Sequence, residues 1–250
     1  MIAIVFAGLG GLAIGSFLNV VAYRLPAHAS LVSPGSACPG CGHAIRPSDN
    51  IPVVSWLLLR GRCRDCSTPI SPRYPLVEAI TAALWVAVIA VKGANEDAIL
   101  GIVLVTLMVP VALIDLDYRI IPNRLLAPAA VVALGVQAVV GSSALPEHLI
   151  AGAAAGLFFL VVVLAYPRGM GMGDAKLAAV LGLFLGREVA VALLVALLVG
   201  SLFGIGVMVR KGVAEGRKTA VPFGPFLALG GIVALLVGAP IVHTYLTHFA

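Results

Sequence analysis

The sequence predicts an all-α, polytopic membrane protein whose helical bundle carries one small polar domain. Of the 250 residues, 61% are hydrophobic and 11% are charged, whereas soluble domains carry about 25% charged residues. The mean hydropathy of +1.10 points the same way. We therefore expect the lipid bilayer to be the main solvent of this chain.

Eight apolar runs are candidate transmembrane helices, at residues 2–23, 76–91, 98–114, 125–140, 148–166, 175–186, 189–209 and 223–246. The run 175–186 is the weakest, because a usual span needs about 17–25 residues. The first run has no cationic segment before it, and its first cation is Arg24. We interpret it as a retained helix rather than a cleaved secretion signal.

The distribution of cations favours one orientation. Lys and Arg concentrate on the cytoplasmic side of short loops. With the N-terminus outside, eight spans place all 16 Lys and Arg except Lys92 and Arg187 on the inner side. We therefore expect a multi-pass protein of the cytoplasmic (inner) membrane that contacts anionic lipid. A nucleic-acid partner is not expected, because no basic patch is interleaved with aromatic residues.

One stretch interrupts the membrane pattern. Residues 25–75 are rich in Pro, Gly, Ser, Arg and Cys. We therefore predict three parts: a first transmembrane helix at 1–24, a cytoplasmic domain at 25–75, and a membrane core at 76–250.

All four cysteines lie in the predicted cytoplasmic domain, as "CPGC" (Cys38, Cys41) and "CRDC" (Cys63, Cys66). Two CxxC pairs at this separation are typical of a zinc ion held by four thiolates. Two disulfides are disfavoured in a reducing cytoplasm. Four thiolates leave no open position for a catalytic water, so the metal would be structural. His43 is the alternative ligand.

Two aspartates stand out at the predicted inner face. Asp115 ends the third span, and Asp174 begins the sixth after the alternating glycines of "GMGMGD". Ionisable groups at span ends are functional candidates. Two carboxylates that share a partly dry site can divide the work of general acid and general base. Asp117 competes with Asp115, although it points to a different helix face.

Structural roles are the alternatives for these acids. Asp174 could simply cap a helix N-terminus, and Asp115 could be an acid at a helix end. Other chemistry finds less support in the sequence, since it has no HExxH motif and its five histidines are scattered.

Several segments along the chain form a recognisable set: "GSFLNVVAYRLP" (15–26), the CxxC pairs around "IPVVSWLLLRGRC" (51–63), "YPLVE" (74–78), "IDLDYRIIPN" (114–123), "GMGDAKL" (171–177) and "PFGPFLALG" (222–230). With these segments in this order, the chain from about residue 8 to about 231 resembles the type IV prepilin peptidases, a family of GxGD membrane aspartic proteases. The resemblance implies that Asp115, seven residues before the proline of "IPN", and Asp174 are the catalytic pair. It also implies cleavage of the basic leader of prepilins and pseudopilins, after a glycine.

The resemblance further implies N-methylation of the new N-terminus with S-adenosylmethionine. No dinucleotide-type glycine fingerprint follows a strand, so that cofactor would bind the 25–75 domain and nearby span ends. The candidate residues are Asn19, Arg24 and Glu78, with Gly15 beside them. Each also has a structural interpretation: an interhelical hydrogen bond for Asn19, an anchor for Arg24, an ion pair for Glu78 and packing for Gly15. Lys176 is expected to be an anchor.

Two other function classes stay open from the residues alone. A transporter would use the membrane acids to carry protons and would cut no prepilin. A non-enzymatic assembly factor would bind pilin helices and would tolerate Asp115→Asn and Asp174→Asn.

Overall fold

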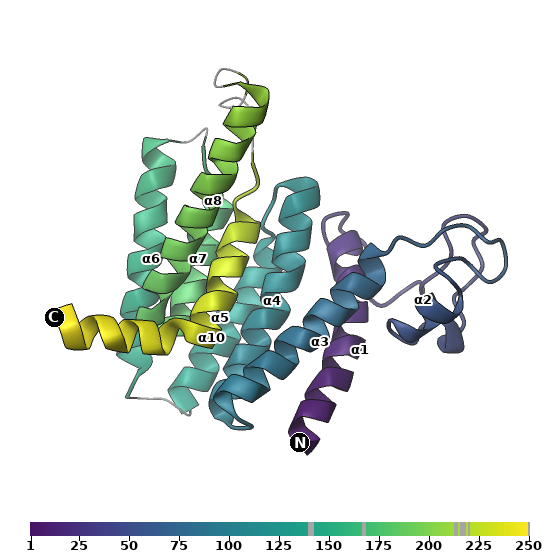
Figure 1. Cartoon of the computed structure of the whole chain (residues 1–250), viewed down its shortest axis with the longest axis horizontal. Coiled ribbons are helices and arrows are strands. Elements are labelled where there is room, and N and C mark those ends of the chain that lie inside the picture. Colours follow the sequence, from purple (N-terminus) through teal and green to yellow (C-terminus); the bar gives the residue numbers. More distant parts are fainter. Residues whose placement is uncertain (140–142, 167–168, 213–214, 216–218, 220, 250) are drawn as a thin grey trace. The chain divides into compact units, whose positions relative to one another are not determined.

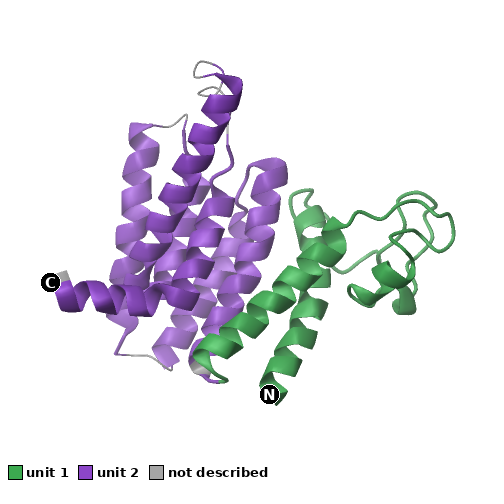
Figure 2. Cartoon of the chain, viewed as in Figure 1, with its two compact units in different colours: residues 1–94 green, residues 95–250 purple. Residues whose placement is uncertain are grey.

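The computed structural model describes residues 1–139, 143–166, 169–212, 215, 219 and 221–249. In this part of the chain every regular element is a helix, and two isolated β-bridges lie in the loops, Ala37–Ala44 and Arg62–Pro69. The chain forms two compact units, Met1–Ala94 and Asn95–Ala250 (Figure 2). The predicted all-α class is confirmed, whereas the boundaries 1–24, 25–75 and 76–250 remain predictions. Three cations of the orientation argument, Arg168, Arg217 and Lys218, lie outside the described residues.

The first unit is a helical hairpin with the cysteine domain between its arms. Its elements are α1 (Ile2–Arg24), the 3₁₀ turn η1 (Pro47–Asp49), α2 (Val54–Leu58) and α3 (Arg73–Lys92). Helices α1 and α3 touch at two glycines. A Cβ on Gly11 would lie 2.6 Å from the Cα of Ala82, and one on Gly15 would lie 2.7 Å from the Cα of Glu78. Small residues let two membrane helices approach this closely.

The second unit is a bundle of helices that run side by side (Figure 1). Its elements are α4 (Glu96–Tyr118), α5 (Asn123–Val139), α6 (Leu145–Ala165), α7 (Met172–Leu185), the turn η2 (Gly186–Glu188), α8 (Val189–Lys211) and α10 (Gly224–Phe249). Helix α7 contacts α4, α5, α6, α8 and α10, and most of its residues are buried. It is therefore the central helix of this unit.

The helices agree with a multi-pass membrane protein. Within the described residues, six segments are long and apolar enough to cross a bilayer, and one of them, the 40-residue segment Met172–Lys211, contains both α7 and α8. Helix α5 is shorter, with 17 residues. The 14 residues of α7 extend about 21 Å, less than the about 30 Å hydrocarbon core. A helix this short is tolerated at the centre of a bundle, because protein rather than lipid surrounds it.

Candidate active site and metal site

Asp115 lies in the last turn of α4, where the helix is closed by Arg119 in the left-handed conformation (φ 56°). Its carboxylate faces the start of α10 and accepts a hydrogen bond from the Gly224 N–H at 2.8 Å on Oδ2. The first N–H groups of a helix have no partner inside the helix. The carboxylate supplies one, at the end of the helix that favours negative charge. Asp115 is 5% exposed.

Asp174 lies in the first turn of α7 and is 7% exposed. Its Oδ2 reaches back and accepts a hydrogen bond from the Gly171 N–H at 3.0 Å. An acid three residues into a helix that bonds the first N–H is half of a capping box. Asp174 is thus not the N-cap itself, a position that Gly171 takes; from the third helical position its carboxylate binds the N-cap N–H, which orients the carboxylate.

The two aspartates come together at one end of the second unit. They are close enough for their charges to interact. The segments that carry them also touch: Lys176 Nζ donates to Asn123 Oδ1 at 3.1 Å, and a Cβ on Gly173 would lie 3.0 Å from the Cβ of Ile121. The end of α4 and the starts of α5, α7 and α10 therefore surround the carboxylate pair.

The competing acid, Asp117, is exposed, as its position two residues further along the helix requires. Each buried aspartate has only Oδ2 in a hydrogen bond within the described part of the chain. No buried side-chain oxygen lacks a hydrogen-bond partner among the described residues, so each unbonded Oδ1 atom keeps some exposed surface. Two fixed carboxylates, each with one oxygen open, can bind a water molecule between them and share a proton.

The four cysteines form a second site, in the first unit. Their Sγ atoms all lie within 4.8 Å of one another, and the Sγ atoms of Cys38 and Cys66 are 3.7 Å apart. Four sulfurs at about 2.3 Å from one metal ion, at the corners of a tetrahedron, are about 3.8 Å apart. The spacing therefore fits one tetrahedral ion. His43 is exposed and is not part of the cluster.

The surroundings of these thiols differ from one cysteine to the next. The backbone N–H groups of Cys41 and Gly40 lower the pKa of Cys38, and hydrogen bonds from Thr68 lower the pKa of Cys66 to about 6. The hydrogen bond from the His43 N–H lowers the pKa of Cys41, but burial and the three neighbouring thiols raise it more, and together these effects raise it to about 12. Two of the four thiols are thus prepared to ionise, which metal binding requires.

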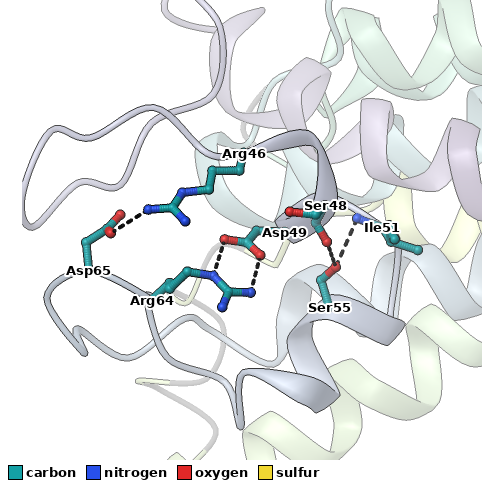
Figure 3. Close-up of polar contacts among 7 residues, drawn as sticks. All are labelled: Arg46, Ser48, Asp49, Ile51, Ser55, Arg64 and Asp65. Carbon is teal, nitrogen blue, oxygen red and sulfur yellow. Dashed lines mark hydrogen bonds and ion pairs between the residues drawn. The ribbon is translucent and has the colours of Figure 1, made fainter.

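Ion pairs hold the second CxxC turn against the segment that follows the first (Figure 3). The Arg64 guanidinium donates two hydrogen bonds to the Asp49 carboxylate, from Nε to Oδ2 at 2.8 Å and from Nη2 to Oδ1 at 2.6 Å. Arg46 forms an ion pair with Asp65 at 3.3 Å. Arg64 and Asp65 are the two middle residues of "CRDC". The Arg64 hydrogen bonds hold the pKa of Asp49 below its usual range.

The three residues predicted to bind a cofactor all lie in the first unit and all make internal hydrogen bonds. Asn19 Nδ2 donates to the carbonyls of Gly15 and Tyr74 at 3.3 and 3.2 Å. Glu78 Oε2 accepts from the Val53 N–H at 2.7 Å. The structural interpretation of Asn19, an interhelical hydrogen bond, is thus observed, while the partner of Glu78 is a backbone N–H.

Arg24 is the half-buried member of the three. Its guanidinium donates to the carbonyls of Ser30 and Gly35 at 3.0 and 3.4 Å. It therefore joins the end of α1 to the loop that leads to the first CxxC turn.

Gly224 was not among the predicted site residues, although it lies inside the "PFGPFLALG" segment. The available signal was Gly-Pro at the start of an apolar helix, since the proline has no N–H and the glycine N–H next to it is left free. Nothing in the sequence pairs this N–H with Asp115, 109 residues away.

Each of the two units contains a segment that matches a known protein family. Residues 9–92 match the model described as the bacterial peptidase A24 N-terminal domain, and residues 102–209 match the type IV leader peptidase family. The first range contains the four cysteines, and the second contains both aspartates.

Curated relatives match over nearly their whole length. A prepilin leader peptidase/N-methyltransferase of Aeromonas hydrophila is 38% identical over 96% of this chain and 93% of its own. Proteins of the same name from Pseudomonas aeruginosa and Bacillus subtilis are 38% and 34% identical, over 94% and 98% of this chain and 91% and 98% of theirs. No solved structure matches. With both halves matched, and the paired carboxylates inside the second, the chain belongs to the type IV leader peptidase family.

Proposed function

We propose that this chain is a membrane aspartic endopeptidase, with Asp115 and Asp174 as its catalytic residues. Its substrates are type IV prepilins and pseudopilins, whose basic leader it removes after a glycine. The observation that carries this proposal is the meeting of the two buried carboxylates, each oriented by one backbone N–H and each with one oxygen open.

The pair would activate water in the manner of an aspartic dyad. One aspartate, ionised, takes a proton from the water whose oxygen attacks the carbonyl carbon of the scissile glycine. The other, protonated, donates a hydrogen bond to the carbonyl oxygen and stabilises the charge that develops there. Collapse of the tetrahedral intermediate breaks the C–N bond, and the leaving amine takes up the proton. The products are the leader carboxylate and the free pilin N-terminus.

The position of the dyad at helix ends suits this substrate. Asp115 ends one apolar helix and Asp174 begins another, so the cut would fall where the pilin helix enters the bilayer. The apolar part of the substrate would then lie among the membrane helices while its basic leader stays in water. Gly171 would let an extended backbone approach Asp174 closely, whereas Ile121 packs against Gly173.

We also propose the methyl transfer that the relatives' names include. S-adenosylmethionine, when bound, supplies the methyl group for the new N-terminal amine. The three candidates Asn19, Arg24 and Glu78 suit this role unequally. Arg24 carries a charge that matches the cofactor's carboxylate, whereas Asn19 and Glu78 are buried and hold backbone groups. Their part would be to shape the walls of that site.

The metal of the four-cysteine site is proposed to be zinc in a structural role. The tetrahedral sulfur spacing supports it, and four thiolates close the coordination shell. The metal would fold the segment between α1 and α3, which is too small to build a core of its own. We further propose that the protein lies in the inner membrane, with its N-terminus outside and the cysteine domain in the cytoplasm, because Lys and Arg gather on that side.

One experiment tests the peptidase, and its variants separate the alternatives. The purified full-length protein is incubated with a leader-bearing prepilin, with and without S-adenosylmethionine, and product masses are measured. We expect loss of the leader in both samples and a gain of one methyl group only with the cofactor. Asp115→Asn and Asp174→Asn should each abolish cleavage, while the matched control Asp117→Asn should keep it.

The outcomes distinguish three functions. An intact prepilin mass with folded wild-type protein would refute the peptidase, and cleavage without methyl gain would refute the transferase alone. A transporter would instead show solute-dependent proton flux that requires the aspartates. An assembly factor would still bind the pilin after both substitutions to asparagine.

A further inference from the structure

Several exposed apolar residues of the cysteine domain lie on one short helix. Helix α2 exposes Val54, Leu57 and Leu58, which are 48%, 61% and 78% exposed. The spacing i, i+3, i+4 places them on one side of the helix. Ile51, just before the helix, is 50% exposed. We call these four residues the α2 apolar face. A contiguous exposed apolar surface of this kind marks a site of interaction.

The opposite side of α2 is tied into its own domain, so the exposed face has a fixed direction. The Ser55 hydroxyl donates to the Ser48 carbonyl at 2.8 Å and accepts the Ile51 N–H at 3.1 Å. The Trp56 indole N–H donates to the Ile70 carbonyl at 3.0 Å. Gly61, with φ of 66°, lets the chain turn against the Trp56 ring, where a Cβ would meet the ring at 2.8 Å.

The beginning of α2 is held at the membrane-entering end of α3. Val53 adopts φ 60° and ψ −51°, and the Val54 N–H bonds the Pro52 carbonyl across it at 2.6 Å. This is the φ-positive γ-turn, which is rare and strained, and more so for a β-branched residue. The Val53 N–H, turned inward, donates to the buried carboxylate of Glu78 at 2.7 Å.

Glu78 belongs to the second turn of the candidate span Arg73–Lys92. The hydrogen bond to its carboxylate therefore fixes the start of α2 beside the second turn of α3. The start of α2 lies next to the residues with which α3 enters the bilayer. Arg60 and Arg62, just beyond α2, are both exposed. Cations beside an apolar helix face are typical of a surface that binds anionic lipid.

From these observations we infer that the α2 apolar face inserts into the interfacial layer of the membrane, where Arg60 and Arg62 bind anionic phospholipid headgroups. The strained turn at Val53 and its hydrogen bond to Glu78 orient the α2 apolar face toward the lipid. The cysteine domain is thereby held at the bilayer surface by a contact in addition to its two covalent links to α1 and α3. This inference rests on the membrane helices and does not depend on the proposed catalysis.

Fluorescence quenching by brominated lipid tests the inference in the full-length protein. Leu58→Trp places a reporter on the face, and the matched control Val32→Trp places one at an apolar residue of the same domain that is 89% exposed and outside the face. Each variant is reconstituted in nanodiscs of phosphatidylcholine with phosphatidylglycerol, brominated near the headgroup or unbrominated. The wild-type signal of Trp56 and Trp85 is subtracted, and circular dichroism verifies the fold.

We expect the added fluorescence of Leu58→Trp to be largely lost in brominated nanodiscs and that of Val32→Trp to be retained. Equal quenching of the two reporters, or none in Leu58→Trp, would overturn insertion. A blue-shifted but unquenched Leu58→Trp signal would overturn it in favour of a protein contact.

The lipid charge is tested with the same reporter. Omitting phosphatidylglycerol should reduce the quenching, and Arg60→Gln with Arg62→Gln should remove this dependence on lipid charge. Quenching that is identical with and without phosphatidylglycerol would overturn the assignment to anionic lipid.

Discussion

Gly224→Ala tests the link between the start of α10 and the carboxylate of Asp115, which we propose to be catalytic. The new Cβ would lie 2.8 Å from Oδ2, 3.0 Å from Cγ and 3.1 Å from Cβ of Asp115. Non-bonded carbon atoms are in favourable contact at about 3.5–4.0 Å, so Asp115 must move by about 0.5 Å or rotate away. Either movement lengthens the 2.8 Å hydrogen bond from the Gly224 N–H.

The expected cost is in catalysis rather than in folding. A 1 Å misplacement of a reacting group can cost about 100-fold in rate. We therefore expect Gly224→Ala to lower kcat/KM for prepilin cleavage by about 10- to 100-fold, or about 1.4–2.7 kcal/mol of transition-state stabilisation. Alanine is a better helix former than glycine, so the thermal midpoint should fall little.

The assay is single-turnover cleavage of a prepilin by protein reconstituted in lipid, with the leader quantified by mass spectrometry. The matched control is Gly206→Ala in α8, where a new Cβ meets nothing within 4 Å; it should cleave at the wild-type rate. Methylation of pilin whose leader has already been removed should be unchanged in both variants. A wild-type cleavage rate for Gly224→Ala would show that the Gly224–Asp115 contact does not matter for the reaction. An equal loss of cleavage rate in Gly224→Ala and Gly206→Ala would show that the helices are generally sensitive to an added methyl group.

The other predictions concern the first unit. Cys63→Ser, or chelation of the metal, should open residues 25–75 to proteolysis while the helical circular dichroism of the bundle persists; an unchanged cleavage pattern would contradict a structural metal. Glu78→Ala leaves the Val53 N–H without its acceptor and should cost about 1.5–3 kcal/mol, seen as faster amide exchange across 51–58, and Glu78→Gln should restore most of the protection. If Glu78→Gln abolishes cofactor binding with normal exchange, Glu78 contacts the cofactor directly. The Asp49–Arg64 pair lowers the pKa of Asp49, so its contribution is complete above the unfolded value of about 3.9 and is lost as the pH falls through the lower folded value. Amide exchange across 46–66 should therefore be faster in Asp49→Asn than in wild type at pH 7, and the difference should vanish in strong acid; Arg46→Gln, from the more exposed pair, should change exchange less, and equal effects would contradict this ranking.

The features that were predicted correctly from the sequence depend on residues that lie close together along the chain. The apolar runs predicted the helices. The distribution of Lys and Arg favoured a sixth span at 175–186, although this run is short. The structure explains the short span, because α7 lies at the centre of its unit with Leu177, Ala178 and Leu181 fully buried. The two CxxC pairs likewise foretold the four-sulfur cluster, because each tight turn brings two thiols together.

What sequence could not give depends on partners far away in the chain. The Gly224 N–H and the Asp115 carboxylate meet only because α10 packs on α4. The structural alternative for the cofactor candidate Glu78 was an ion pair. Its acceptor role toward Val53 depends instead on a backbone turn that no local preference favours. Residue types can indicate a free backbone N–H, such as that of Gly224 before a proline, but they cannot indicate which distant acid accepts its hydrogen bond.

The use of backbone donors at both proposed catalytic acids has a chemical reason. An arginine or lysine bonded to either carboxylate would favour the ionised form of that group and would oppose the sharing of one proton. A helix-start N–H orients the carboxylate with only a partial charge of the helix dipole, about half a unit. The nearby Lys176 makes its hydrogen bond to Asn123 rather than to Asp174. The first turns of α7 and α10 thus fix the two acids in place and leave the pair free to hold one proton between them, which acid–base catalysis by a dyad requires.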